Sequence, residues 1–296
     1  MKYLVSLIFL LNFYLVKSQN INELKNKINK ILENKNATVG VAIESHDSKE
    51  TISINGDKKF PLQSVFKYHI ALKVLEEVDK GKFTLNQRIK INKSEVEHEL
   101  YSPIREKYPN GTIMKLSKII KYTVSESDNT GCDLLLKLIG GPKTVETYLK
   151  QKGINDVAIN YNEKTQQSEW NLQFENWITP KAANKSLSLF FTKQNNQFSN
   201  LSYNFIWETM KETETGLNRL KGYLPKNVIV AHKTGSSGVN KEGITAAVND
   251  IGVIILPNGK YYFISVFVTE SKENSEINER IIAEISKATY DYFNKK

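Results

Sequence analysis

The stretch Gln63-Ser64-Val65-Phe66-Lys67 opens a helical pattern and carries a serine and a lysine one turn apart. From Val65 to Val78 apolar residues recur at helical spacing, and Gly81 supplies a stop. We therefore predict that a helix begins at Ser64. Unpaired backbone N–H groups and the helix dipole favour developing negative charge at that end of a helix.

Ser64 and Lys67 form a candidate nucleophile and its partner. A serine hydroxyl has almost no anionic form near neutral pH, so it attacks a carbonyl only if a neighbouring group takes its proton. Side chains three or four residues apart share one helix face, which brings the two polar ends together. The spacing arises by chance about once in a chain of this size, so alone it indicates only a solvated pair.

Two further polar triplets follow in the chain, Ser127-Asp128-Asn129 and Lys233-Thr234-Gly235. The first lies between two helical patterns, and the second lies in a late strand pattern. No other lysine in the sequence is followed by Ser or Thr and then Gly. Three motifs in this order and context are much rarer than any one of them, so together they indicate an active site.

The composition is that of an ordinary globular protein of one or two domains, with 296 residues, 40% apolar and 25% charged. Cys132 is the only cysteine, which excludes an internal disulfide, and its apolar neighbours indicate a core position. The formal charge is +9, but basic residues are interleaved with acidic ones, so we expect no nucleic-acid partner. The 4 histidines show no metal-ligand spacing, and we expect no metal and no cofactor.

The first residues have the features of a secretory signal. Lys2 precedes an apolar stretch from Leu4 to Val16, which is too short to span a bilayer comfortably. We predict a signal peptide over residues 1–18 and a mature chain that starts near Gln19; an uncleaved membrane anchor is the less favoured alternative. The protein would then be exported, periplasmic or secreted, without membrane attachment after cleavage, and a monomer.

Strand patterns lie at both ends of the chain and helical patterns lie between them. The strand patterns cover 38–45, 51–54, 228–233, 245–256 and 261–269, and a last helix covers 275–293; the middle helices cover 114–124, 132–139, 143–151, 182–191 and 202–210. We predict an α/β (α+β) fold in which residues 19–60 and 222–296 form an antiparallel sheet flanked by helices. Residues 61–221 would form an inserted all-α lobe, with the active site between the two.

On these motifs the chain resembles the class A serine β-lactamases, over nearly its whole length after the signal. Gln63, Asn162-Glu163, Asn176-Trp177 and the run from Ala231 to Gly235 are most similar to the PER-type extended-spectrum branch. The resemblance implies hydrolysis of the β-lactam ring of penicillins and cephalosporins, with resistance to these antibiotics. It also implies the β-lactamase/transpeptidase-like fold.

The resemblance implies a role for each polar residue of the three motifs. Ser64 would attack the carbonyl and form an acyl-enzyme. Its proton would leave through Lys67 or through a water held by Glu163, and this choice stays open. Ser127 would pass a proton to the lactam nitrogen, with Lys233 holding its hydroxyl. The backbone N–H groups of residues 64 and 236 would form the oxyanion hole.

Glu163 would activate the catalytic water that releases the product; a solvent-exposed loop carboxylate is the alternative. It lies in a long polar segment from Val157 to Trp177, and long connections are often functional. The family pattern Glu-x-x-Leu-Asn is replaced here by Glu163-Lys164-Thr165-Gln166-Gln167, and Gln167 is expected to hold the water. The Arg and Asp pair that usually fixes this loop is replaced by Tyr161 and Asn176.

Substrate contacts follow from the same resemblance. The substrate carboxylate needs donors, and Arg219 is expected to supply the guanidinium, because the stretch from Ser237 to Thr245 contains no arginine. A surface role for Arg219 and a packing role for Tyr101 are the alternatives. The expected substrate-binding residues are Asn129, Lys233, Thr234, Gly235, Ser236, Arg219, Tyr101 and Gln167.

Two other functions share part of this pattern. A penicillin-binding DD-peptidase has the serine–lysine pair and the Lys-Thr-Gly triplet but lacks the water-activating carboxylate, so Glu163 argues against it. A β-lactam sensor domain acylates without turnover and needs a transmembrane partner segment, which the chain does not show after its signal. Hydrolysis is therefore the favoured function.

Overall fold

The computed structural model describes residues 21–96, 99–192 and 197–295. The predicted signal peptide, residues 1–18, and the predicted mature start at Gln19 lie outside these ranges. Within them, no helix is both long enough and apolar enough to cross a membrane.

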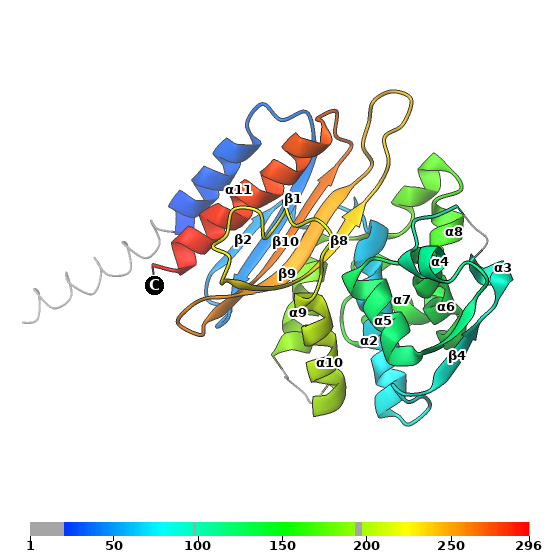
Figure 1. Ribbon diagram of the computed structural model, residues 1–296. Helices are drawn as coiled ribbons and strands as arrows, with labels where there is room; N and C mark the ends of the chain where they lie inside the picture. Colours follow the sequence, from blue (N-terminus) through cyan, green and yellow to red (C-terminus); the bar gives the residue numbers. More distant parts are fainter. Residues whose placement is uncertain (1–20, 97–98, 193–196, 296) are drawn as a thin grey trace, which may run out of the picture.

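The centre of the molecule is a five-stranded sheet in the order β2-β1-β10-β9-β8 (Figure 1). Every neighbouring pair in it is antiparallel, and β1 pairs with β10 so that Thr38 lies opposite Thr269. The strands are β1 (Thr38–Ser45), β2 (Thr51–Ile54), β8 (Ile229–Ser236), β9 (Val248–Ile255) and β10 (Tyr261–Thr269). The prediction of one antiparallel sheet made from both ends of the chain is therefore confirmed.

Helices cover both faces of this sheet, which is why its strands are apolar on both sides. The helix at residues 21–32 and α11 (Ser275–Phe293) pack on one face, where Leu24, Ile28 and Ile285 meet the strands. The other face packs against the inserted segment, through α9 (Pro180–Phe191) on β1 and β10 and through residues 63–65 and 200–211 on β8 (Figure 1). Each of these large apolar side chains stabilises the fold by about 1.5–3 kcal/mol when fully buried.

The inserted segment is mainly helical but not all-α, which corrects the prediction for residues 61–221. β4 pairs with β5, and β7 lies between β3 and β6. The helix expected from Met114 begins only at Leu116, because residues 112–115 are extended and pair with residues 88–91. Besides α9, the inserted segment contains β3 (Phe60–Pro61), the 3₁₀ turn η1 (Gln63–Val65), α2 (Phe66–Asp79), β4 (Arg88–Ile91), α3 (Lys93–Val96), α4 (Pro103–Lys107), β5 (Thr112–Lys115), α5 (Leu116–Ser125), α6 (Asn129–Ile139), α7 (Pro142–Gln151), β6 (Val157–Ala158), α8 (Glu163–Gln166), η2 (Trp170–Phe174), β7 (Trp177–Ile178) and α10 (Asn200–Lys211).

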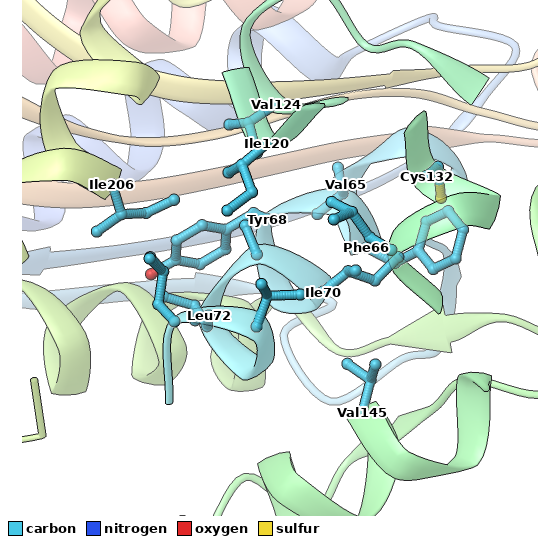
Figure 2. Packing of buried hydrophobic residues seen from close by; sticks show 14 of the residues in the cluster. Val65, Phe66, Tyr68, Ile70, Leu72, Ile120, Val124, Cys132, Val145 and Ile206 are labelled. Atoms are coloured by element: carbon cyan, nitrogen blue, oxygen red, sulfur yellow. The ribbon is translucent and has the colours of Figure 1, made fainter. Parts of the chain in front are cut away.

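Helix α2 is the centre of this segment. Its residues from Phe66 to Leu72 are completely buried, and α2 packs against α5, α6, α7 and α10. Figure 2 shows side chains of α2 among those of its neighbours, including Ile120, Cys132 and Ile206. Cys132 is a core residue, as predicted, and burial raises the pKa of its thiol. A helix packed on all sides cannot shift without moving its neighbours, so α2 is a rigid base for the residues at its start.

Candidate active site

Ser64 lies on the tight turn η1, which runs directly into α2 as the sequence pattern predicts. The preceding residue, Gln63, has a left-handed backbone with φ of +43°, a conformation that costs a non-glycine residue about 1 kcal/mol or more and is concentrated at functional sites. Its buried side chain donates to Oε1 of Gln173 at 2.9 Å and accepts from Nε2 of Gln167 at 3.3 Å. The turn is therefore tied to the long polar loop.

Gly235 lets strand β8 approach this turn. A Cβ at residue 235 would lie 2.7 Å from the carbonyl oxygen of Leu62, so any side chain would push the strand away. Asn249 on β9 adds a second connection, because its Nδ2 donates to the carbonyls of Pro61 at 2.8 Å and Leu62 at 3.3 Å. Close packing of β8 against the turn therefore requires glycine at the third position of the Lys-Thr-Gly motif.

Lys67 contacts four oxygen atoms of the site. Its Nζ lies 2.7 Å from Oγ of Ser64, 3.0 Å from the carbonyl oxygen of Ser127, 2.5 Å from Oδ1 of Asn129 and 2.6 Å from Oε1 of Glu163. The side chains of Lys67 and Glu163 are 0% and 1% exposed, so water screens neither charge. An ammonium has three hydrogens for these four oxygens, so Ser64 need not be one of the acceptors at every moment.

Ser127 faces Ser64 from the other side of the site. Its backbone is left-handed, with φ of +58°, and its Oγ accepts from Nζ of Lys233 at 3.0 Å. Burial and the nearby Lys67 charge hold the pKa of Lys233 well below its usual range, while Asp250 and Glu163 partly oppose this. Lys233 is thus a buried donor whose proton is held less tightly than that of an exposed lysine.

Asp128, between Ser127 and Asn129, organises the motif without facing Ser64. Its carboxylate accepts from Gly131 N at 2.7 Å, Ile104 N at 2.7 Å and Ser102 Oγ at 2.9 Å. Burial raises its pKa, and these three donors counteract part of that rise. Asp128 therefore caps α6 and fixes the loop that presents its two neighbours.

Glu163 is buried, which excludes the exposed-carboxylate alternative. Burial alone would raise its pKa, but the charge and hydrogen bond of Lys67, together with Gln166 and Gln167, hold that pKa below its ordinary value. Gln166 Nε2 lies 2.7 Å from Oε2 of Glu163, whereas Gln167 Nε2 lies 3.4 Å away. The sequence singled out Gln167, and the structure shows that the buried Gln166 is the nearer donor.

Two side chains hold the loop in place of the missing Arg and Asp pair. Oδ1 of Asn176 accepts from Asn160 N at 2.7 Å and Tyr161 N at 2.9 Å, and its Nδ2 donates to Gln166 Oε1 at 2.9 Å. From α6, Asp133 accepts from Glu163 N at 2.8 Å and from Lys164 N at 3.2 Å. Burial raises the pKa of Asp133 to about 6.

Arg219 is a buried residue of the site rather than a surface arginine. Its guanidinium donates to the carbonyls of Gly235 at 3.1 Å and Asn249 at 3.0 Å, to Oγ of Ser236 at 2.7 Å, and to Glu279 at 3.1 Å. The hydroxyls of Thr234 and Thr215 lie 2.6 Å apart beside it. Donors for an anion thus gather at the end of β8.

These residues surround a cleft of about 320 Å³. Tyr101 stands at its rim with 53% of its surface exposed, which argues against a pure packing role. The charged residues Lys67, Glu163, Lys233 and Arg219 are buried behind the cleft wall. The cleft is lined by Ser64, Leu100, Tyr101, Ser127, Asn129, Gln167, Thr215, Thr234, Gly235 and Ser236.

The structure therefore brings all twelve residues predicted from the sequence to one place. It adds Gln63, Gln166 and Thr215, for which the sequence predicted no role in the site. The three-residue spacing from Glu163 to Gln166 was a usable signal, because it puts both on one side of a helical turn. Within residues 21–96, 99–192 and 197–295, no group of three or more His, Cys, Asp or Glu side chains is arranged to hold a metal ion.

Comparisons of this chain with known proteins all point to one enzyme family. The family model described as the β-lactamase enzyme family matches residues 23–293. The chain is 51% identical to β-lactamase VEB-1 of Pseudomonas aeruginosa, over 99% of this chain and 97% of that one. It is 42% identical to the extended-spectrum β-lactamase PER-1 of the same organism, over 92% and 88%. A solved structure representing class A β-lactamase, from Bacteroides cellulosilyticus, is similar with a TM-score of 0.89 and 40% identity, over 94% of this chain and 99% of that chain.

Proposed function

Because this chain belongs to the β-lactamase enzyme family, we propose that it opens β-lactam rings through an ester at Ser64 and releases the product with a water activated by Glu163. It is a class A β-lactam hydrolase, and its activity confers resistance to these antibiotics. The observation that supports the proposed residues best is the position of Lys67. Its Nζ lies between Oγ of Ser64 at 2.7 Å and Oε1 of Glu163 at 2.6 Å.

In the first step, Oγ of Ser64 bonds to the lactam carbonyl carbon. The serine proton passes to Lys67, which must first give up its ammonium proton, or to Glu163 through a water; Oγ of Ser64 lies 2.7 Å from Nζ of Lys67 and 3.4 Å from Oε1 of Glu163. The backbone N–H groups of Ser64 and Ser236 stabilise the oxyanion; removing one such donor from an enzyme costs about 3–4 kcal/mol. The carbon–nitrogen bond then breaks: Ser127 gives the nitrogen a proton and takes up the proton that Ser64 released, while Lys233 holds the Ser127 hydroxyl.

In the second step, Glu163 takes a proton from water, and the hydroxide attacks the ester carbon. The ionised state that the Lys67 ammonium favours in Glu163 is the state that a general base needs. Gln166 and Gln167 donate to the same carboxylate and restrict its orientation. The ester bond to Ser64 breaks, Oγ of Ser64 takes the proton that Glu163 removed from water, and the free enzyme is regenerated.

The substrate carboxylate is bound by Thr234, Ser236 and Arg219, whose donors gather at one end of the cleft. Asn129 contacts the side-chain amide of the substrate, and Tyr101 packs against it at the rim. Similarity to a relative named as an extended-spectrum enzyme supports an extended substrate range. We also propose a monomer that is exported by cleavage of residues 1–18 and acts in the periplasm or outside the cell.

A buried Glu163 beside Ser64 also separates this function from its rivals. A DD-peptidase or a sensor domain keeps its acyl group because no carboxylate activates water beside the ester. Purified enzyme should therefore turn over a chromogenic cephalosporin many times per active site, with absorbance counted against protein concentration. A single stoichiometric burst, with one drug adduct per chain in the intact mass, would favour the acylating proteins without turnover.

Asp133 predicts a pH effect on the second step. Its pKa of about 6 means that acidification from pH 7 to pH 5 protonates it, and one of the two N–H groups of Glu163 and Lys164 then loses its acceptor. The Glu163 charge raises the pKa of Asp133 further, and the Lys67 charge opposes that rise. We expect kcat to fall several-fold over this range, and the acid limb to flatten in Asp133→Asn.

The sign of the stability change separates this effect from unfolding. A carboxyl group whose pKa is higher in the folded chain than in the unfolded chain stabilises the fold as pH falls. Between pH 7 and pH 5, Asp133 therefore makes the fold more stable while the loop loses activity. A pH profile of kcat with the same acid limb in Asp133→Asn would contradict this assignment.

A further inference from the structure

A buried histidine–aspartate pair lies beside the active site and has no place in the mechanism above. Nδ1 of His232 is 2.9 and 3.0 Å from the two carboxylate oxygens of Asp250, and both side chains are 0% exposed. A carboxylate only accepts, so Nδ1 carries the hydrogen. Nε2 of His232 is buried and has no hydrogen-bond partner among the described residues. A buried pair with an unsatisfied nitrogen is poor evidence for stability, so another role is required.

Strand alternation places this pair on the opposite face of β8 from the nucleophile. Successive residues of a strand point to opposite faces. Lys233 points to Ser127, and its neighbours His232 and Thr234 therefore point to the other face, where the Thr234 side chain reaches the edge of the cleft. Asp250 is the cross-strand partner of Thr234 on β9. The pair thus lies beside Thr234: His232 is two residues before it on β8, and Asp250 is opposite it on β9.

Residues 213–221, here called the covering segment, lie over this face and carry Arg219. The hydroxyl of Thr213 donates to the carbonyl of His232 at 2.8 Å. The backbone N–H of Leu220 donates to Oδ2 of Asp250 at 3.2 Å. Asp250 thus binds His232 on β8 and the residue that follows Arg219 in the covering segment.

We propose that His232 and Asp250 are positioning residues for the carboxylate-binding end of the cleft. The pair holds the covering segment against β8 and so fixes the Arg219 guanidinium and the Thr234 hydroxyl where they bind the substrate carboxylate. This inference rests on the proposed roles of Arg219 and Thr234. It explains why a hydrogen-bonded polar pair occupies a site that apolar side chains could fill.

Asp250 also acts on the charges around it. Burial lowers the pKa of Lys233 and of Lys221 in the covering segment, and the Asp250 carboxylate opposes the shift in both. The other charges that act on Lys233 are Lys67 on α2, Glu163 on α8 and Arg219. Removing the Asp250 charge lowers the pKa of Lys233 further. Lys233 then loses its proton at a lower pH, and the alkaline limb of kcat/KM moves to lower pH.

The test compares Asp250→Asn with wild type on a penicillin and on its methyl ester. We expect kcat/KM for the acid to fall roughly 10- to 100-fold, mainly through KM, because a weakened hydrogen bond to a charged group has this size. The ester lacks the carboxylate, so its kcat/KM should change less than about threefold. Ser265→Ala is the matched control, since Ser265 lies on β10 of the same sheet and the substitution removes its buried hydrogen bond to Asn184 on α9. It should lower stability and leave the acid-to-ester ratio unchanged.

His232 provides a second pair of variants if Asp250→Asn does not fold. Asn at 232 keeps a donor near the position of Nδ1, whereas Ala does not, so His232→Asn should retain the acid-to-ester ratio and His232→Ala should lose it. The positioning role would be overturned if Asp250→Asn kept the wild-type acid-to-ester ratio and the wild-type alkaline limb of kcat/KM. It would also be overturned if His232→Ala kept the wild-type acid-to-ester ratio. A wild-type enzyme that prefers the ester, or hydrolyses neither compound, would instead contradict the proposed function.

Discussion

Ser64→Ala should lose acylation completely and reduce kcat by about a million-fold, the scale on which an enzyme loses a nucleophile that acts as a unit with its base. Neither the nearby hydroxyl of Ser127 nor the thiol of Cys132 can replace Ser64 as the nucleophile. Ser127 is held by Lys233 at 3.0 Å, and Cys132 is buried in the core with a raised pKa. The measurements are turnover of a chromogenic cephalosporin and intact mass after incubation with the drug.

Ser275→Ala is the control for Ser64→Ala, because Ser275 is an exposed serine at the start of α11, in the layer beyond the sheet. It should keep wild-type turnover. Circular dichroism should show Ser64→Ala folded, since Ser64 contributes only a hydroxyl at the edge of the core. A drug adduct in the mass of Ser64→Ala would show that another residue is the nucleophile.

The sequence predicted the site well where its geometry is local. Ser64 and Lys67 are one turn apart on a single helix, and the residues from 233 to 236 lie on a single strand, so periodicity alone placed each group. Neither the Ser64–Lys67 motif nor the Lys-Thr-Gly motif specifies the distance between the helix and the strand that carry them. That distance depends on Gly235, whose missing side chain lets β8 lie against the carbonyl of Leu62.

Contacts between distant segments were not predictable from the same patterns. Met114 continues the helical spacing of α5, yet it belongs to a strand because residues 88–91 lie opposite it. Gln166 and Asn176 meet because the loop folds back on itself, and no periodic pattern indicates such a return. His232 and Asp250 belong to different strands, and only the register of β8 with β9 brings them together.

The long polar loop from Val157 to Trp177 departs from the family pattern, and other hydrogen bonds replace the contacts that it lacks. Tyr161 and Asn176 replace a charged pair, and the structure shows one amide serving two backbone N–H groups and a second amide. The Asn176 amide fixes the loop without adding a charge to that of Asp133, whose carboxylate holds the N–H groups of Glu163 and Lys164. The charge balance of Glu163 is then left to Lys67, which is the partner that the chemistry uses.

Glu163→Gln should trap the enzyme as its ester. The amide keeps the shape of the side chain but cannot take a proton from water, so deacylation should slow by about 10²–10⁴-fold, the usual contribution of a general base. Acylation still has a route through Lys67, whose Nζ lies 2.7 Å from Oγ of Ser64. We expect a rapid burst of one product equivalent, followed by a slow steady rate and a persistent drug adduct in the intact mass.

The same variant decides between the two acylation bases. If Lys67 takes the serine proton, the burst rate in Glu163→Gln should stay within about tenfold of wild type, whereas a base role of Glu163 should slow the burst as much as the release. Glu169→Gln is the matched control, because Glu169 is an exposed carboxylate of the same loop. It should leave both phases unchanged. Continued fast turnover by Glu163→Gln would show that water is activated elsewhere, since a buried carboxylate that is dispensable for release has no catalytic role in it.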